Sequence, residues 1–359
     1  MFKTFENYLI KLFLKKVLTI SFIFLSLILI LSVFEEISFF KDLETNFFFP
    51  FLITILNAPA TLFEIFPFIF LISAQFFFLE LINKNELEVF KVHGLNNIKI
   101  IKLLFFTSFF LGLFLVLIYY NFSSKLKFLY LELKNNYSND NKYLAVVTEN
   151  GLWIKDEIDN KIYIINASQI EDSFLKDVII SEFTNNFDLI RIIESSRVDI
   201  SNTNWIILDP IISKDNVTAK NQKKIILNSH FDEKKINSLF RNLSSLNILE
   251  LTKLNKDYND LGYSTVEVRS HLHKIFSLPV YLSIMTIFAS IIMFNIKRNK
   301  PLIFHIILGI FLSVLIYYFY YLSNLLGESG KIPLYASVWL PLLMLTIFIF
   351  IGLVRINEK

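Results

Sequence analysis

The sequence predicts an α-helical membrane protein with six transmembrane helices, three on each side of an inserted all-β domain that we expect to be a β-jelly-roll. Two observations lead to this fold class. Three long apolar stretches precede residues 143–228 and three follow them, and only this middle region changes from a helical to an extended hydrophobic pattern. The chain is also 54% hydrophobic with a mean hydropathy of +0.53, well above what soluble domains show.

The composition disfavours or excludes several classes of function. The net charge of +3 is small and dispersed, and no basic stripe alternates with stacking aromatic residues, so a nucleic-acid role is disfavoured. The absence of cysteine excludes disulfides, thiolate metal sites and cysteine nucleophiles. The inserted domain would therefore have to be stable through its core alone.

The first span is predicted over residues 17–34, which would reach roughly 27 Å at about 1.5 Å per residue. Lys11, Lys15 and Lys16 precede this run, as in a signal peptide. No small-residue cleavage site follows, so we expect a span and not a leader.

The next apolar region, residues 47–81, is too long for one perpendicular helix and is interrupted by prolines. We expect an interfacial segment over residues 47–57 and a second span from Pro59 to Leu81, with Pro59 near its first turn. The third span is predicted over residues 98–121.

A polar connection, residues 83–97, joins spans two and three. Leu87, Phe90 and Lys91 lie near one face of a short predicted helix that includes Glu86, and Gly94 is suited to end that helix in the left-handed conformation. Such a helix is either a simple connection or the element on which a separate ATPase acts.

Lysine and arginine in the short loops predict the orientation. The basic residues concentrate in the two termini and in the connections after spans two and four, whereas only Lys41 and Lys331 stand in the loops after spans one and five. Both termini are therefore predicted to be cytoplasmic and the inserted domain to face outward.

The inserted region begins with a predicted amphipathic helix over residues 122–136 and continues as short strands separated by turn residues such as Asn150-Gly151. Strands at this spacing are typical of an antiparallel sandwich or jelly-roll. We expect strands at residues 143–148, 152–155, 161–166, 177–183, 189–193, 205–208 and 224–228.

Two predicted strands, Ile162-Tyr163-Ile164-Ile165 and Trp205-Ile206-Ile207-Leu208, are apolar on both faces. A sheet with one face in water needs only one apolar side per strand. The pattern reflects either isoleucine enrichment from an AT-rich genome or an apolar interior open to a lipid chain.

A second amphipathic helix is predicted at residues 245–260, followed by a polar approach to the membrane over residues 263–274. The last three spans are predicted at residues 275–296, 302–322 and 334–353. The predicted division is thus residues 1–121 for spans one to three, 122–142 for a connecting helix, 143–230 for the β domain, 231–274 for the return connection and 275–359 for spans four to six.

Catalytic and metal-binding signals are weak. Gly327-Glu328-Ser329-Gly330-Lys331 resembles only the tail of a P-loop, and His271 and His273 have no third ligand nearby. Glu64 and Glu80 lie in the second span, where a charge usually faces protein or a cavity. We expect Glu80 to be solvated near the inner interface, and Glu64 either to make a buried helix contact or to line a cavity.

This layout and a set of short runs resemble the LptF/LptG family, the permease subunits of the lipopolysaccharide exporter in Gram-negative inner membranes. The resemblance covers nearly the whole chain, and the runs near residue 150 and in span six are more similar to LptG than to LptF. The runs are Pro59 to Pro67, Glu86 to Gly94, Asn150 to Asp156, Gly330-Lys331-Ile332-Pro333 and Trp339-Leu340-Pro341.

The resemblance implies a transport subunit without its own nucleotide site or cofactor. A second LptF/LptG-type permease would complete a cavity open to the outer leaflet, and a dimeric LptB-like cytoplasmic ATPase would drive the pair. Lipopolysaccharide would be lifted into the periplasmic β-jelly-roll and passed to a single-span LptC-like protein and an LptA-like bridge. The rival interpretation is a membrane-anchored scaffold or sensor whose periplasmic β domain binds a protein partner.

The resemblance also implies roles for individual residues. The expected ATPase-coupling residues are Glu86, Leu87, Phe90, Lys91 and Gly94, with Lys91 where the family usually has arginine. Glu35 and Glu36 stand where the family carries basic residues for lipid phosphates, so the expected phosphate contacts are Lys41, Lys125, Arg269 and Lys274. The expected acyl-chain path is formed by Ile162, Ile164, Ile180 and Ile207.

Overall fold

The structure is a computed structural model that forms two compact units, Met1–Tyr130 with Val266–Lys359, and Leu131–Thr265. The two units, a helical one and a β-rich one, are described separately. The residues described are 2–41, 46–93, 96–135, 137, 152–158, 161–171, 173–214, 217–219, 223–233, 236, 242–260, 264–294 and 301–357.

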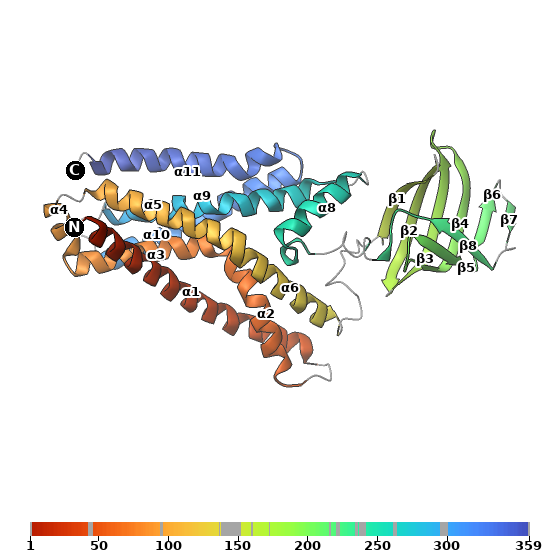
Figure 1. The fold of residues 1–359 in the computed structure, drawn as a ribbon, viewed down its shortest axis with the longest axis horizontal. Coiled ribbons are helices and arrows are strands. Elements are labelled where there is room, and N and C mark those ends of the chain that lie inside the picture. The colour runs from red at the N-terminus through yellow and green to blue at the C-terminus, as the bar shows by residue number, and fades with distance from the viewer. Residues whose placement is uncertain are drawn as a thin grey trace. The chain divides into compact units, whose positions relative to one another are not determined.

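The helical unit confirms the prediction of six spans, because six of its helices are long and apolar enough to cross a membrane. Figure 1 shows them as a bundle in which the N-terminal half and the C-terminal half of the chain lie side by side. The helices are α1 (Phe2–Phe40), α2 (Phe49–Glu64), α3 (Phe66–Asn83), α4 (Glu86–Val92), α5 (Asn97–Phe114), the π-helix η1 (Leu115–Tyr119), α6 (Tyr120–Asn135), α9 (Val266–Phe294), α10 (Leu302–Glu328) and α11 (Leu334–Asn357).

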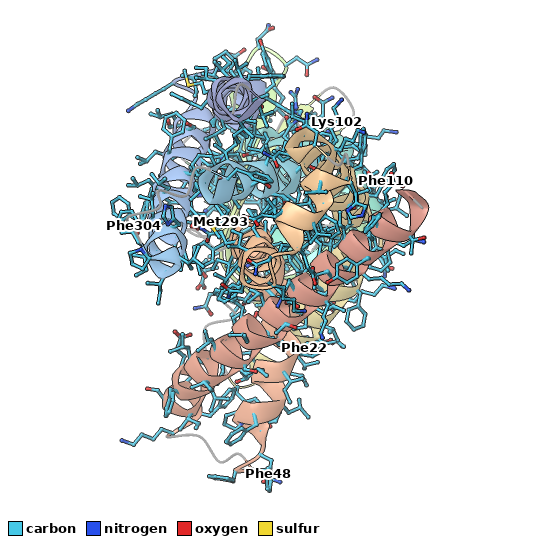
Figure 2. All side chains as sticks on the ribbon, turned by 90° about the vertical axis from the view of Figure 1, so that its left-hand side faces the viewer. Phe22, Phe48, Lys102, Phe110, Met293 and Phe304 are labelled. Carbon is cyan, nitrogen blue, oxygen red and sulfur yellow. The ribbon has the colours of Figure 1, made fainter. Side chains whose placement is uncertain are left out.

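Helices α3 and α9 form the centre of this unit, since two thirds of each apolar window is buried. Helix α9 packs against α3, α5 and α11. In contrast, less than a third of the apolar window of α1, α10 and α11 is buried, and each of these helices exposes many large apolar side chains. Figure 2 shows Phe110 and Phe304 pointing outward on opposite sides of the unit, whereas Met293 of α9 lies between them. The outer helices therefore present surfaces suited to lipid or to another membrane protein.

The second span begins later than the sequence predicts. Pro59 lies inside α2, and the helix break falls at Ile65, with Pro67 in the first turn of α3. The physical reason is that Pro67 lacks the N–H that would continue the α2 ladder and is well tolerated at a helix start. The Ile65 carbonyl instead accepts from the N–H groups of Phe68 at 3.0 Å and Ile69 at 3.1 Å.

The predicted amphipathic helix after span three is not separate from that span. α5, η1 and α6 follow one another without a break, so the candidate span runs over Asn97–Lys134. Near its middle Gly112 approaches α9 so closely that a Cβ atom there would lie 2.7 Å from the Pro279 Cα. Similarly, the polar approach predicted before span four is helical from Val266 onward.

The second unit confirms an all-β domain inserted between the helices. Its described strands belong to one antiparallel sheet, in which β1 to β5 pair in chain order, β8 pairs with β5, and β6 pairs with β4 and β7. The strands are β1 (Leu152–Ile158), β2 (Lys161–Glu171), β3 (Phe174–Thr184), β4 (Leu189–Asp199), β5 (Asn204–Leu208), β6 (Ile211–Lys214), β7 (Val217–Ala219) and β8 (Lys224–Asn228).

One face of this sheet forms the core of the unit. Ile154, Ile165, Ile180 and Ile193 stand opposite one another on four neighbouring strands, and each side chain is at most 1% exposed. Further along, the fully buried Trp205 donates its indole N–H to the Phe231 carbonyl oxygen at 2.7 Å. This satisfied hydrogen bond allows the largest side chain of the core to be completely buried.

The return connection contains the 3₁₀-helix η2 (Leu243–Ser245) and the helix α8 (Ile248–Asp260). α8 begins three residues later than predicted because Asn247 caps it. The Asn247 side-chain oxygen accepts from the Glu250 N–H, and the Glu250 carboxylate accepts from the Asn247 N–H, both at 2.9 Å. This reciprocal pair is a capping box.

Candidate functional site

Helix α4 lies immediately after α3, within three residues of its end. The intervening Asn85 has a φ of 57°, a left-handed conformation that asparagine tolerates better than most residues. Its N–H donates to the Ile82 carbonyl oxygen at 3.0 Å, which closes the turn. Figure 1 shows α4 at the end of the helical unit where α1 begins and α11 ends.

One face of α4 is attached to α1. The Tyr8 hydroxyl donates to both carboxylate oxygens of Glu86, at 2.8 and 3.0 Å. The Phe90 ring, only 4% exposed, packs edge-on against Phe5 with 5.4 Å between the ring centroids and lies 6.4 Å from the Tyr8 ring. We call these four residues, Phe5, Tyr8, Glu86 and Phe90, the α1–α4 contact. It combines a charge-assisted hydrogen bond with an aromatic cluster in which Phe90 is buried.

The opposite face of α4 is free of the helical unit and partly apolar. Val89 is 49% exposed and Val92 is 85% exposed, while Leu87 is half-buried and Glu88 is exposed. Val89 and Val92 are three residues apart and therefore lie near one another on the surface of this seven-residue helix.

The structure brings together three of the five expected coupling residues, since Glu86, Leu87 and Phe90 all lie on α4. Lys91 is also in α4, but its side chain, like Gly94 as a whole, lies outside the described residues. Sequence reasoning missed Phe5 and Tyr8 because it treated the residues before the first span as a tail. The signal that would have identified them is the spacing of Phe2, Phe5 and Tyr8 by three residues, which is that of one helical face.

A second contact joins α1 to the end of α3 beside α4. Glu80 forms ion pairs with Lys16 of α1 and with Lys84, whose ammonium lies 2.7 Å from a carboxylate oxygen. The hydrogen bond to Glu80 raises the pKa of Lys84. Glu80 is therefore paired as well as partly solvated, and α1 is attached to both ends of the α3–α4 turn.

The four cations expected to contact lipid phosphate lie on separate parts of the helical unit. Lys41 follows the end of α1, Lys125 lies on α6 and Arg269 on α9, and all three side chains are exposed. Lys274 differs from the others, because its ammonium lies 2.8 Å from Glu328, which also accepts from the Ser270 hydroxyl at 2.9 Å. Part of its charge is thus already compensated within the chain.

The acidic pair at the end of α1 divides into two environments. Glu36 is only 3% exposed and accepts a hydrogen bond from the Tyr130 hydroxyl at 2.9 Å, whereas Glu35 is exposed. Glu36 therefore joins α1 to α6, whereas the side chain of Glu35 lies at the surface.

A cavity of about 280 Å³ lies beside the break between α2 and α3. Its wall is mostly aromatic and aliphatic, and Glu64 contributes the only carboxylate among the lining residues. It is lined by Phe24, Phe68, Tyr281, Met285, Val314 and Tyr317, together with Glu64 and its neighbours. Of the two roles expected for Glu64, the structure supports cavity lining, because Glu64 is exposed and makes no hydrogen bond or ion pair with any described residue.

The structure does not bring the four residues of the expected acyl-chain path onto one face of the sheet. Ile180 and Ile207 point into the core and are at most 1% exposed. Ile164 stands opposite Ser181 and Ile162 opposite Phe183, which puts both on the other face of β2 from Ile165, the partner of Ile180.

The weak catalytic and metal signals have structural explanations. The His271 imidazole lies 3.0 Å from the Tyr120 hydroxyl, and within the described ranges no cluster of three metal-binding side chains occurs. Gly330, with a φ of 73°, terminates α10, and the Lys331 N–H donates to the Leu326 carbonyl oxygen at 3.0 Å. Gly330 therefore ends a helix.

Comparison with known proteins identified one family. Its sequence model, described as "Lipopolysaccharide export system permease LptF/LptG", matches residues 7–356. A search of proteins with curated functions found no match. The family match includes all six candidate spans, except for the first residues of α1, and the whole β unit.

Proposed function

Since the chain belongs to the LptF/LptG family, the permeases of the lipopolysaccharide export system, we propose that it is the LptG-like subunit of a transporter driven by a separate ATPase. The subunit would extract lipopolysaccharide from the outer leaflet of the inner membrane together with a second permease. It would then pass the lipid through its periplasmic β unit to an LptC-like protein and an LptA-like bridge.

The observation that carries this proposal is the α1–α4 contact. An ATPase seated on the exposed face of α4 would bind Val89, Val92 and Glu88 while the buried face stays attached to α1. Movement of α4 would then be transmitted to α1, the helix whose apolar surface is the least buried of the six candidate spans. ATPase closure could thus change the shape of a cavity formed between α1 and a second permease without any nucleotide site in this chain.

The proposed orientation is supported by two independent features. The start of α1, the end of α11 and α4 share one end of the helical unit (Figure 1). Among the short loops and termini, those predicted at that end carry most of the lysine and arginine. Three candidate spans separate the N-terminus from the β unit. If each crosses the membrane once, the β unit must lie on the opposite side from the N-terminus.

The energetics of acyl-chain burial limit how a lipid could enter the β unit, because exposing a chain to water costs about 0.8 kcal/mol per CH₂. A lipid chain could leave the membrane only along a path that keeps it covered or with energy supplied by the ATPase. The isoleucine row around Ile180 supplies an apolar interior, and Ile207 belongs to the same buried core. Photo-crosslinkers at these two positions should form lipid adducts during transport. Persistent absence of adducts in a working complex would contradict this path.

Co-purification tests the central claim most directly. The full chain, expressed together with the other subunits of its complex and purified, should retain a nucleotide-binding subunit and a second six-span permease. Glu86→Ala should reduce lipid export per ATP hydrolysed, or weaken retention of the ATPase, whereas Glu6→Gln, which changes an exposed carboxylate of α1 outside the α1–α4 contact, should have a smaller effect. Normal export by the Glu86 variant would refute the coupling role, and a complex without an ATPase would favour a periplasmic scaffold.

A further inference from the structure

The cavity at the α2–α3 break contains a carboxylate, that of Glu64, which pairs with none of the described residues. This leads to an inference about the lipid headgroup that the chain recognises. Glu64 is the last residue of α2. Two cationic side chains, Lys127 and Lys274, interact with it electrostatically, and each is engaged elsewhere. Lys127 donates to the Asn57 side-chain oxygen at 2.6 Å, and Lys274 lies 2.8 Å from Glu328.

The depth of Glu64 places it near the level of lipid headgroups. α3 has 18 residues, so at about 1.5 Å per residue it spans roughly 27 Å, close to the hydrocarbon thickness of a bilayer. α4 adjoins one end of α3 and Glu64 adjoins the other. In the orientation proposed above, α4 is cytoplasmic and Glu64 therefore lies at the outer-leaflet boundary.

The remaining lining of the cavity selects the kind of cation that would pair with Glu64. Aromatic rings of Phe24, Phe68, Tyr281 and Tyr317 line the same cavity, and the Phe24 and Phe68 rings meet edge to face at 5.5 Å. A hard metal ion requires about six or more oxygen ligands. One carboxylate among aromatic rings is instead suited to an ammonium group, which is attracted both to the charge and to the ring faces.

We propose that this cavity binds a primary ammonium group on a lipid headgroup, with Glu64 as its counter-ion. The inference rests on the proposed function for its orientation and adds a feature of the substrate: an amine-bearing headgroup. The amine could belong to an amino substituent on the exported glycolipid or to an ethanolamine phospholipid of the same leaflet.

A photo-labelling comparison tests the proposal on the purified full chain in a neutral maltoside detergent, without nucleotide. The two probes are dodecylamine and dodecanol, each with the same photoreactive diazirine, and adducts on cavity residues such as Met285 and Val314 are quantified by mass spectrometry. The unsubstituted chain should label with the amine about tenfold more than with the alcohol, a preference equivalent to about 1.4 kcal/mol. Glu64→Gln should remove that preference.

The control is Glu35→Gln, which removes an exposed carboxylate outside the cavity lining and should retain the preference. Phe68→Leu, which removes one ring and no charge, should reduce it severalfold and serves as the second variant if Glu64→Gln does not fold. Equal labelling by the two probes in the unsubstituted chain would overturn the proposal. Retention of the amine preference by Glu64→Gln would overturn the role of Glu64.

Competition then identifies the source of the amine. Lipopolysaccharide with amino substituents should compete better than the same lipid without them if the substrate supplies the group, whereas phosphatidylethanolamine should compete best if a phospholipid does. Either result supports the ammonium site, and failure of both to compete overturns it. The labelling experiment uses no ATPase, so equal labelling by the two probes would overturn the ammonium site and leave the transport proposal standing. Conversely, a purified complex without an ATPase would overturn the transport proposal and leave the labelling result standing.

Discussion

Removing the Tyr8 hydroxyl should loosen α4 from α1 without unfolding either helix. The hydroxyl donates to both oxygens of Glu86, and hydrogen bonds to charged groups contribute about 1.5–3 kcal/mol. Because Tyr8 is 38% exposed, water replaces part of this interaction, so we expect a loss of about 1 kcal/mol. That loss corresponds to about a fivefold rise in the fraction of molecules with α4 detached.

Native-state hydrogen exchange of the purified chain measures this fraction directly. The Val89 and His93 amides donate to the Asn85 and Val89 carbonyl oxygens, so their exchange reports opening of α4. Tyr8→Phe should increase their exchange about fivefold. Phe90→Ala, which empties a site that is 4% exposed, should cost about 3 kcal/mol or more and abolish the protection.

Glu88→Gln is the matched control for this experiment, because it removes the same charge from the same helix without touching Tyr8. The double variant Tyr8→Phe with Glu86→Gln should show less than additive loss, since both changes remove one interaction. Unchanged exchange in Tyr8→Phe, or an equal increase in Glu88→Gln, would refute the reasoning that the α1–α4 contact holds α4.

Three further predictions concern other parts of the chain. Burial of Glu182 would by itself raise its pKa, but hydrogen bonds from Lys161 and Arg191 outweigh burial and lower it. The stabilisation that ionised Glu182 gives the folded β unit is therefore complete above the unfolded-state pKa of about 4.3 and is lost as pH falls through the lower folded pKa. Hydrogen exchange of the β3 amides should accordingly rise on acidification. Glu182→Gln should make this exchange less dependent on pH. Trp205→Phe should lower the free energy of unfolding of the β unit by about 1–3 kcal/mol, because the buried Phe231 carbonyl oxygen loses its donor. Denaturant unfolding followed by the circular dichroism of the sheet measures this loss. An unchanged free energy of unfolding would show that the bond is unimportant. Gly309→Ala should lower the melting temperature by disturbing the packing of α3 on α10, because a Cβ there would lie 2.0 Å from the Gln75 side-chain nitrogen. Adding Gln75→Ala to Gly309→Ala should restore the melting temperature. Failure to restore it would show that the clash lies elsewhere.

The spans and the β insert could be predicted from the sequence because burial in lipid and burial in a sheet leave different hydrophobic periods. The span boundaries were less predictable. Pro59 and Pro67 are equally good helix-start signals in the sequence, yet α2 continues through Pro59 and the new helix begins beside Pro67. The strands β6 and β7 were missed because they are short: β6 is held by pairing with β4, about 20 residues earlier in the sequence, and β7 pairs with β6.

The candidate site was only partly predictable for the same reason. Glu86 and Phe90 were recognised from a local motif, but Tyr8, which lies 78 residues from Glu86 in sequence, is connected to them only by the fold. Glu36 shows the same limit. Its side chain is buried and accepts a hydrogen bond from Tyr130, which lies 94 residues away in sequence, so only the fold shows this contact.

The unbroken run from α5 to α6 has a mechanical consequence. It begins at Asn97, just beyond α4, ends at Asn135 within the first residues of the second unit, and meets Pro279 closely at Gly112. Gly112 lies 15 residues from the first end and 23 from the second, so a rigid rod pivoting there would swing its far end about one and a half times as far as its near end, in the opposite direction. The π-helical turn η1 lies just beyond that fulcrum, where a local change of pitch would redirect the swing.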